Sequence, residues 1–297
     1  MTEITDNLVA AFSIEGHPVR GRIARLGSAI DEVMSHHDYP EPVANLLGEA
    51  CALASLVGSA LKFDGRLIVQ AQGNGPVAYV VCDYETDGSM RGYCRFDADR
   101  VAEVSQGFVR PGAKTLLGDG VFIMTIDQGP DMDRYQGVTP IEGETLALCA
   151  EQYFAQSEQT PTRLRLAVGQ VNDGSGAKWR AGGIMIQMIG GDAARGDTEE
   201  SWDHVRALFE TTGEDELIDP TVPAETLLYR LFHEDGVRLF EAQPLKAFCR
   251  CSPARIETVL QSFSDEERAD MVEADGKIHV TCEYCSRVYD LDPNAAG

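Results

Sequence analysis

Short runs of apolar and β-branched residues alternate with turn-forming residues between positions 66 and 96. The runs cover residues 66–72, 77–84 and 90–96, and they are separated by Gly73-Asn74-Gly75-Pro76 and by Thr86-Asp87-Gly88-Ser89. Glycine, asparagine, proline and aspartate supply the backbone conformations that tight turns need. This pattern predicts three antiparallel strands joined as a meander.

Two longer segments follow a helical period instead. In residues 42–62 and 142–157 the apolar positions recur every three or four residues. Two further strand-like runs, residues 163–171 and 182–189, come after the second helix. Because the strands are grouped and the helices lie between the groups, without strict alternation of strand and helix, we predict an α+β fold built on antiparallel sheet.

A glycine-rich stretch, residues 189–197, predicts a domain boundary. We therefore expect three parts: an N-terminal α+β core domain at 1–191, an acidic helical linker at 192–243 and a small C-terminal domain at 244–297. Two clusters of apolar residues at helical spacing predict the helices of the linker. Their members are Trp202, Val205, Leu208, Phe209, Leu227, Leu228, Leu231 and Phe232.

The negative charge of the chain is concentrated in this linker. The 297 residues carry a formal net charge of −23, and residues 192–243, with 14 acidic and 4 basic side chains, contribute −10. Such a segment is either a pair of solvated amphipathic helices packed on a neighbour or an element that docks reversibly. Self-repulsion makes the docked form of so acidic a segment easier to release than an ordinary core helix.

The charge and the apolar runs also argue against two classes of partner. Nucleic acid phosphates are bound by lysine and arginine, and the sequence has no basic stretch. The longest apolar run, residues 50–61, is too short to cross a bilayer, and the acidic N-terminus lacks the features of a secretory signal. We therefore expect a cytoplasmic protein that binds neither nucleic acid nor membrane. Thiols stay reduced in that compartment, so the eight cysteines do not imply four structural disulfides.

Four of the cysteines form two close pairs near the C-terminus, Cys249-x-Cys251 and Cys282-x-x-Cys285. Residues i and i+2 of an extended strand point to the same side, and a C-x-x-C turn likewise presents two sulfurs to one point. Four thiolates at about 2.3 Å form a tetrahedral zinc site, and such soft ligands favour zinc over magnesium or calcium. An iron–sulfur cluster is the less favoured alternative, because the spacing matches neither common ferredoxin motif.

The remaining cysteines and the histidines are expected to have structural or solvated roles. His279 lies on the opposite face of its predicted strand from Cys282, so its imidazole should point away from the sulfurs. His36 and His37 lack a third ligand at a sensible spacing and are interpreted as a solvated helix end. Free cysteine among apolar residues packs as a small hydrophobe, and this interpretation applies to Cys51, Cys82, Cys94 and Cys149.

Several short catalytic motifs are missing from the sequence, and their absence excludes only the enzymes that carry them. Gly73-Asn74-Gly75-Pro76 lacks the third glycine of a dinucleotide fingerprint, and no Walker, nucleophile-elbow or His-Glu-x-x-His motif occurs. A thioredoxin-like centre would place C-x-x-C at the start of a helix, whereas a strand-like run follows Cys285. For the cysteine site itself, two functions stay open as alternatives to the one that follows below. They are a thiol–disulfide oxidoreductase and a constitutive binding protein with purely structural zinc.

Motifs spread over nearly the whole chain occur together with the cysteine pairs. Cys249-x-Cys251-Ser252 with Cys282-x-x-Cys285 is the most specific, and the others are LKFDGRL at 61–67, RYQG at 134–137, EGETL at 142–146, EQYF at 151–154, PTR at 161–163 and LFHE at 231–234. In this combination the chain resembles the 33 kDa chaperonin family of redox-regulated heat-shock holdases. Ser286 departs from the family, which usually has glycine after the second pair, but the departure removes no ligand.

The resemblance implies a function and a mechanism, and it implies that the protein is not an enzyme. In the reduced and inactive state the thiolates of Cys249, Cys251, Cys282 and Cys285 hold zinc. Peroxide or hypochlorous acid, together with unfolding conditions, forms the disulfides Cys249–Cys251 and Cys282–Cys285, zinc leaves, and the C-terminal domain and linker unfold. The activated protein, typically a homodimer, holds unfolding client proteins without ATP and later passes them to ATP-dependent foldases.

Physical arguments make this mechanism credible. Structural zinc contributes an apparent free energy of about 10–16 kcal/mol, against about 5–15 kcal/mol for the stability of a whole domain, so a small module without its metal should unfold. Arg250, Arg255 and Arg287 either offset the charge of the thiolates or belong to the solvated surface. Release of the linker would expose apolar side chains that either bind clients or serve only to dock it: Trp202, Leu208, Phe209, Leu228 and Phe232.

Overall fold

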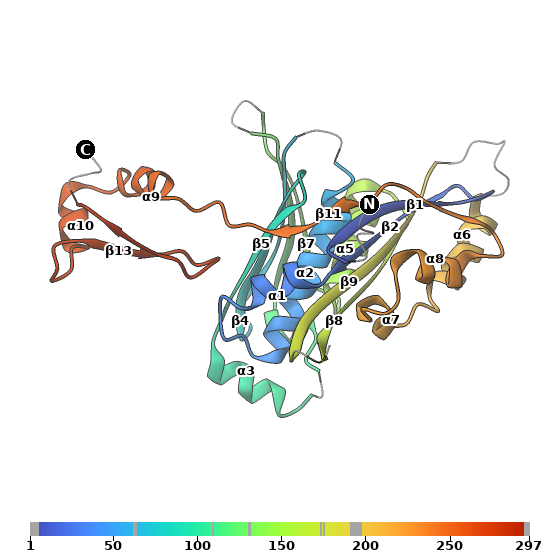
Figure 1. The fold of residues 1–297 in the computed structure, drawn as a ribbon, viewed down its shortest axis with the longest axis horizontal. Helices are drawn as coiled ribbons and strands as arrows, with labels where there is room; N and C mark the ends of the chain where they lie inside the picture. Colours follow the sequence, from blue (N-terminus) through green and yellow to red (C-terminus); the bar gives the residue numbers. More distant parts are fainter. Residues whose placement is uncertain are drawn as a thin grey trace. The chain divides into compact units, whose positions relative to one another are not determined.

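A computed structural model describes residues 6–61, 64–108, 110–129, 132–172, 174, 176–190 and 198–293. The chain divides into two compact units, Met1–Ala247 and Phe248–Gly297, which are described separately (Figure 1). Most of the glycine-rich boundary expected at 189–197 lies outside the described residues, as do Lys62 and Phe63 of the LKFDGRL motif. No helix in the described part of the chain is both long enough and apolar enough to cross a bilayer.

The first sheet of the larger unit has the strand order β10-β1-β2-β9-β8, with β11 also paired to β1. All of its pairings are antiparallel. The hairpin of β1 and β2, which forms its centre, was not predicted from the sequence. The strands are β1 (Leu8–Ile14), β2 (Val19–Leu26), β8 (Thr162–Asn172), β9 (Ala177–Met188), β10 (Val237–Leu239) and β11 (Gln243–Pro244).

The second sheet has the order β12-β5-β4-β3-β6-β7 and contains the predicted meander. It is antiparallel except at its edge, where β12 runs parallel to β5. The mixed α+β architecture with antiparallel sheets is therefore confirmed. The strands are β3 (Arg66–Gly73), β4 (Val77–Glu85), β5 (Ser89–Phe96), β6 (Gly120–Asp127), β7 (Tyr135–Pro140) and β12 (Lys246–Ala247).

Helix α2 (Glu41–Gly58) packs between the two sheets and is buried on nearly all sides. Glycines allow the strands to approach it closely, because a Cβ at Gly48 would collide with Val168 of β8 and one at Gly58 with the ring of Tyr84 of β4. The other helices before residue 190 are α1 (Ser28–Met34), α3 (Ala98–Ser105), α4 (Ala113–Leu117), α5 (Leu146–Tyr153) and the π-helix η1 (Phe154–Glu158).

The opposite face of the first sheet is covered by three helices from the acidic segment (Figure 1). Two of them, α6 (Thr198–Phe209) and α8 (Ala224–Phe232), correspond to the predicted apolar clusters, and α7 (Glu214–Ile218) is too short to have been anticipated. The ring centroids of Phe12 on β1 and Phe232 on α8 lie 5.9 Å apart in a stacked arrangement. The acidic segment thus contributes a second hydrophobic core on this sheet.

The smaller unit contains two short helices and one hairpin. They are α9 (Pro253–Leu260), α10 (Asp265–Asp270), β13 (Ile278–Thr281) and β14 (Val288–Leu291), and the two strands pair antiparallel. Side-chain caps begin both helices: the Ser252 hydroxyl accepts from Arg255 N, and Ser264 forms a capping box with Glu267. The buried apolar side chains of the core among residues 248–293 are few: Leu260, Ile278, Tyr289 and Leu291.

Candidate functional site

The four cysteines of the two C-terminal pairs meet in the smaller unit, where their Sγ atoms all lie within 4.8 Å of one another. Across the pairs, Cys249 Sγ is 3.7 Å from Cys282 Sγ and Cys251 Sγ is 3.4 Å from Cys285 Sγ. A set of four sulfur donors this close together fits a tetrahedral thiolate site for zinc. Residues 249, 251, 282 and 285 are thus brought together as the spacing predicted.

Local backbone structure positions each pair. Cys251 directly precedes Ser252, the N-cap of α9. The second pair spans the turn between β13 and β14, where Ser286 N donates to Cys282 O at 2.8 Å and Cys282 N donates to Arg287 O at 2.9 Å. The C-x-x-C motif therefore lies in a strand-to-strand turn and not at the start of a helix. This turn does not provide the helix dipole that activates the thiols of oxidoreductases.

Ser286 has a φ of 53°, in the left-handed region. A side chain with a Cβ is strained there, whereas glycine enters this region freely. The geometry therefore gives a physical reason for the glycine that the resemblance leads one to expect at this position. Ser286 adopts the conformation of the turn while leaving all four thiols in place.

Tyr289 is a contact of the cluster that sequence reasoning missed. Its hydroxyl donates to Cys251 Sγ at 3.1 Å, and its ring belongs to the small core. Burial alone would raise the pKa of Cys251, but hydrogen bonds from Tyr289 and from the neighbouring thiols lower it to about 7. For Cys285, burial and the neighbouring thiols together raise the pKa to about 12. The cluster therefore contains one thiol that ionises readily beside one that does not.

The charged residues near the cluster behave differently from one another. Arg287 hydrogen-bonds to Tyr289, which raises the pKa of the guanidinium, and this contact brings one of the three candidate arginines next to the sulfurs. His279 Nδ1 lies 2.8 Å from Asp290 Oδ1 and its Nε2 lies 3.0 Å from Asp275 Oδ2. The hydrogen bond to Asp290, followed by that to Asp275, raises the pKa of His279. Both ring nitrogens are engaged by carboxylates, so the imidazole is not a ligand of the cysteine cluster, as expected.

The other four cysteines have the structural role that was predicted for them. Cys51, Cys82, Cys94 and Cys149 are at most 1% exposed and belong to the main hydrophobic core. Burial raises the pKa of Cys82, Cys94 and Cys149. A protonated and buried thiol is a poor nucleophile and a poor metal ligand.

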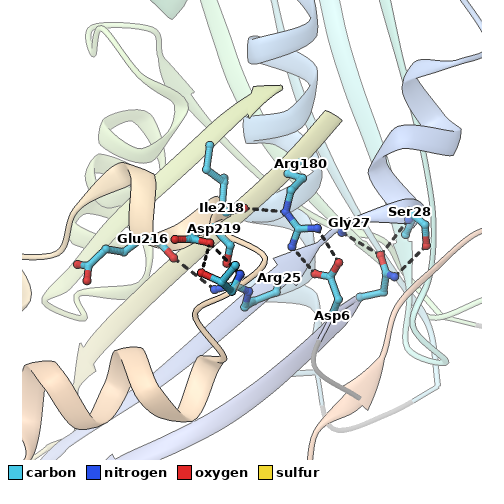
Figure 2. Close-up of polar contacts among 11 residues, drawn as sticks. Asp6, Arg25, Gly27, Ser28, Arg180, Glu216, Ile218 and Asp219 are labelled. Carbon is cyan, nitrogen blue, oxygen red and sulfur yellow. Dashed lines mark hydrogen bonds and ion pairs between the residues drawn. The ribbon is translucent and has the colours of Figure 1, made fainter. Parts of the chain in front are cut away.

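The acidic segment is held on the first sheet by arginines as well as by apolar packing (Figure 2). Arg25 on β2 is 1% exposed and donates to the carbonyls of Glu216 and Asp219. Arg180 on β9 donates from Nε to Ile218 O at 2.7 Å and from both terminal nitrogens to the Asp6 carboxylate. The last carbonyls of a helix have no partner within the helix, so these arginines satisfy the C-terminal end of α7.

A third arginine does the same for α6. Arg165 on β8 donates to Thr212 O at 2.7 Å and to Glu210 O at 3.3 Å, just beyond the end of that helix. The contacts with α6 and α7 were not predicted, because a single arginine in a strand-like run gives no indication of its partner 45 to 194 residues later. Cationic side chains here bind the backbone of the most acidic part of the chain.

The apolar residues considered as client-binding candidates lie in this interface. Four of them are buried in the core that the acidic segment forms with the first sheet: Trp202, Phe209, Leu228 and Phe232. Leu208 is partly buried against the same core. The structure therefore places all five in the docking interface of the segment, where they are covered.

Comparisons with known proteins agree with one another. The family model described as Hsp33 protein matches residues 6–292. The chain is 76% identical over 295 residues to the 33 kDa chaperonin of Caulobacter vibrioides, covering 99% of this chain and 98% of the relative. It is 38% identical over 280 residues to the 33 kDa chaperonin of Escherichia coli O7:K1, covering 94% and 89%.

A solved structure shows the same fold. The crystal structure of the 33 kDa chaperonin from Thermotoga maritima superposes with a TM-score of 0.79 at 23% identity, covering 98% of this chain and 96% of that one. Together, the full-length family match, the two curated relatives and the four-cysteine cluster agree with the resemblance seen in the sequence. The chain is a member of the Hsp33 family.

Proposed function

We propose that the protein is a redox-regulated, ATP-independent holdase chaperone of the cytoplasm, without enzymatic activity, whose switch is the four-cysteine centre. The observation that carries this proposal is the pairing of four clustered thiols with a unit whose core contains only four buried apolar side chains within residues 248–293. A unit with so small a core depends on a cross-link for its fold. A reagent that removes the cross-link therefore controls whether the unit is folded.

In the reduced state Cys249, Cys251, Cys282 and Cys285 are the proposed ligands of zinc. When bound, zinc supplies the cross-link between the start of α9 and the β13–β14 turn that the small core does not supply. Tyr289 orients Cys251 through its hydrogen bond and packs in the core at the same time. The ligand set and the core thus depend on each other.

Oxidation removes the ligands. In each close pair, Cys249 with Cys251 and Cys282 with Cys285, two thiolates lose two electrons to one hydrogen peroxide, which takes up two protons from the solvent. The peroxide O–O bond breaks, an S–S bond forms and two water molecules leave. A disulfide sulfur is no longer a thiolate ligand, so the proposed pairings leave the smaller unit without its cross-link.

Unfolding of the smaller unit would reach the acidic segment through the chain itself. Cys249 follows Ala247, the last residue of β12, by only two positions, and β11 and β12 each have two residues. Detachment of the segment would uncover the second hydrophobic core, including Trp202, Phe209 and Phe232. We propose that this surface binds unfolding clients, that the active form is a homodimer and that clients pass to ATP-dependent foldases.

The proposal is tested by oxidising the zinc-loaded protein with hydrogen peroxide or hypochlorous acid at elevated temperature. Zinc release, free thiols and light scattering from a heat-denatured client are followed together. The proposal expects zinc release, loss of four thiols and suppression of scattering by the oxidised form only. Zinc release without improved suppression would refute the switch, and a centre inert to mild oxidant would indicate structural zinc in a constitutive binding protein. Turnover of a disulfide substrate that depends on Cys282 and Cys285 would indicate an oxidoreductase.

A further inference from the structure

Three side chains with metal-binding atoms meet on the larger unit, which does not contain the cysteine centre. His17 lies in the turn between β1 and β2, His204 lies on α6 and Asp235 follows α8. One ligand atom from each residue lies within 4.8 Å of the other two. The cluster therefore joins the first hairpin of the core to both main helices of the acidic segment.

The distances in this cluster fit ligands that share one ion. Asp235 Oδ1 is 3.3 Å from His17 Nε2 and 3.1 Å from His204 Nε2. Two ligands bound at about 2.0–2.1 Å to a tetrahedral ion lie about 3.3 Å apart. The carboxylate is therefore spaced from each imidazole as a shared ion requires, and the two histidines offer ligand atoms within 4.8 Å of each other.

The two rings are also arranged to present the same kind of atom. The imidazoles of His17 and His204 are stacked with centroids 5.3 Å apart and planes 22° apart, and both direct Nε2 toward Asp235. His17 Nδ1 is buried and has no hydrogen-bond partner among the described residues. Because no described group donates a hydrogen bond to Nδ1, the ring proton can lie on Nδ1. In that tautomer Nε2 presents its lone pair to a cation.

We propose that His17, His204 and Asp235 bind a divalent transition-metal ion of the zinc class, with water in the remaining position. Two imidazoles and one carboxylate suit zinc, nickel, cobalt or copper and do not suit the all-oxygen preference of magnesium and calcium. His204 is 48% exposed on its side chain, so solvent reaches the fourth position. The site is distinct from the cysteine cluster in donor type and in sequence, and three mixed ligands should bind less tightly than four thiolates.

The ion would stabilise the docked state of the acidic segment. His17 lies in the β1–β2 turn of the core sheet, whereas His204 and Asp235 belong to the acidic segment. The complete ligand set therefore exists only while the segment is docked. A ligand that binds only one of two states stabilises that state in proportion to its concentration over its Kd. The consequence that this metal delays activation rests on the proposed function, but binding of the metal does not.

Metal counting on the full chain tests the site. Reduced protein with its cysteine centre zinc-loaded is dialysed against free zinc, and bound zinc per chain is measured for the wild type and for His204→Ala, His17→Ala and the control His233→Ala. We expect the wild type and His233→Ala to bind one more ion per chain than His204→Ala and His17→Ala. Zinc held by surface carboxylates would persist in all four proteins. Equal counts in all of them would overturn the site and leave a hydrogen-bonded cluster only.

Amide hydrogen exchange of α6 gives a second readout that does not depend on activity or on the variants folding identically. Zinc at ten times its Kd should slow exchange through undocking of α6 by about tenfold in the wild type and not in His204→Ala. An unchanged exchange rate in the wild type would contradict the claim that zinc stabilises the docked state of the segment. The oxidation assay of the cysteine centre is independent of both measurements, so failure here is distinguishable from failure of the proposed function.

Discussion

The two units of this chain achieve a folded state by different means. The larger unit has two hydrophobic cores, in which side chains such as Ile23, Leu53 and Phe122 are completely buried. The smaller unit has four buried apolar side chains within residues 248–293, and one of them, Tyr289, is also bonded to the cysteine cluster. Burial is a property that oxidants do not remove, whereas the proposed thiolate ligation would be removed by two-electron oxidation. Under the proposed function, this difference would confine redox sensitivity to one end of the chain.

The largest expected effect separates the units directly. Cys282→Ala removes one of the four proposed ligands, and the coupled loss of metal and fold should exceed about 5 kcal/mol in the smaller unit. Amide exchange should lose protection in β13 and β14 while β3 and β4 keep theirs. The matched control Cys94→Ala, at a buried cysteine of β5, should cost only about 1 kcal/mol and retain zinc. Equal losses of zinc and of amide protection in the two variants would show that the smaller unit does not depend on its cysteine cluster more than the larger unit depends on a buried cysteine.

A smaller effect is expected where the acidic segment meets the sheet. Arg25→Ala leaves the carbonyls of Glu216 and Asp219 without their charged donor, at a cost of about 1.5–3 kcal/mol. Amide exchange of α7 should therefore accelerate, and the reduced protein should be activated by milder heating. Arg95→Ala, at an exposed arginine of β5, is the control and should change neither. If α7 exchanges as slowly in Arg25→Ala as in the wild type, apolar packing alone holds the segment.

A pH-dependent effect is expected inside the larger unit. Burial raises the pKa of Glu49 on α2 to about 7, against a lowering contribution from the hydrogen bond that Leu146 N donates at 3.1 Å. The folded state therefore holds this proton more tightly than the unfolded state, whose carboxyl titrates near 4.3. The contribution of Glu49 to the free energy of unfolding is therefore fully present below about pH 4 and is lost as the pH rises through 7.

Glu49→Gln should remove this loss. We expect the variant to be more stable than the wild type by about 1–2 kcal/mol at pH 8, since water reaching this partly buried side chain reduces the full penalty. At pH 5 the difference should fall to about a third of its value at pH 8. Denaturant unfolding at both pH values measures the difference, and a difference that does not depend on pH would show that Glu49 is not the titrating group.

The smallest effect concerns the turn that carries the second cysteine pair. Ser286→Gly relieves a side chain at φ 53° and should stabilise the smaller unit by about 0.5–1 kcal/mol. Higher concentrations of chelator or peroxide should then be needed to unfold it. As a control, Ser262→Gly, placed in the smaller unit after α9, should not give this gain. A loss of stability in Ser286→Gly would mean that the serine side chain contributes more than its strained backbone costs.

Local spacing accounts for what the sequence revealed of the site. Cys249 and Cys251, like Cys282 and Cys285, are close in sequence, so strand and turn geometry alone place each pair of sulfurs together. The alternation around His279 likewise predicted that the ring points away from the sulfurs. The strands of the meander and the helix at α2 were predicted for the same reason, because periodicity is a local property.

Contacts between distant residues could not be predicted in this way. Tyr289 looks like any strand residue until the fold places its hydroxyl against Cys251, 38 positions earlier. Arg25 would be assigned to solvent from its charge, yet it is buried because α7 supplies carbonyl partners 191 and 194 residues away. His17 and Asp235 are 218 positions apart, so no spacing rule joins them. Such contacts depend on topology, which one unaligned sequence does not reveal.

The three short strands β10, β11 and β12 also determine which backbone groups are available to other chains. β10 and β11 cover the outer side of β1, and β12 covers the outer side of β5. Were residues 237–247 to detach, β1 and β5 would each become an edge strand with a row of unpaired backbone donors and acceptors. Open edges attract extended polypeptide whatever its side chains, which is the recognition that a binder of many unfolded sequences needs. While docked, the same residues keep β1 and β5 from pairing edge to edge with another chain.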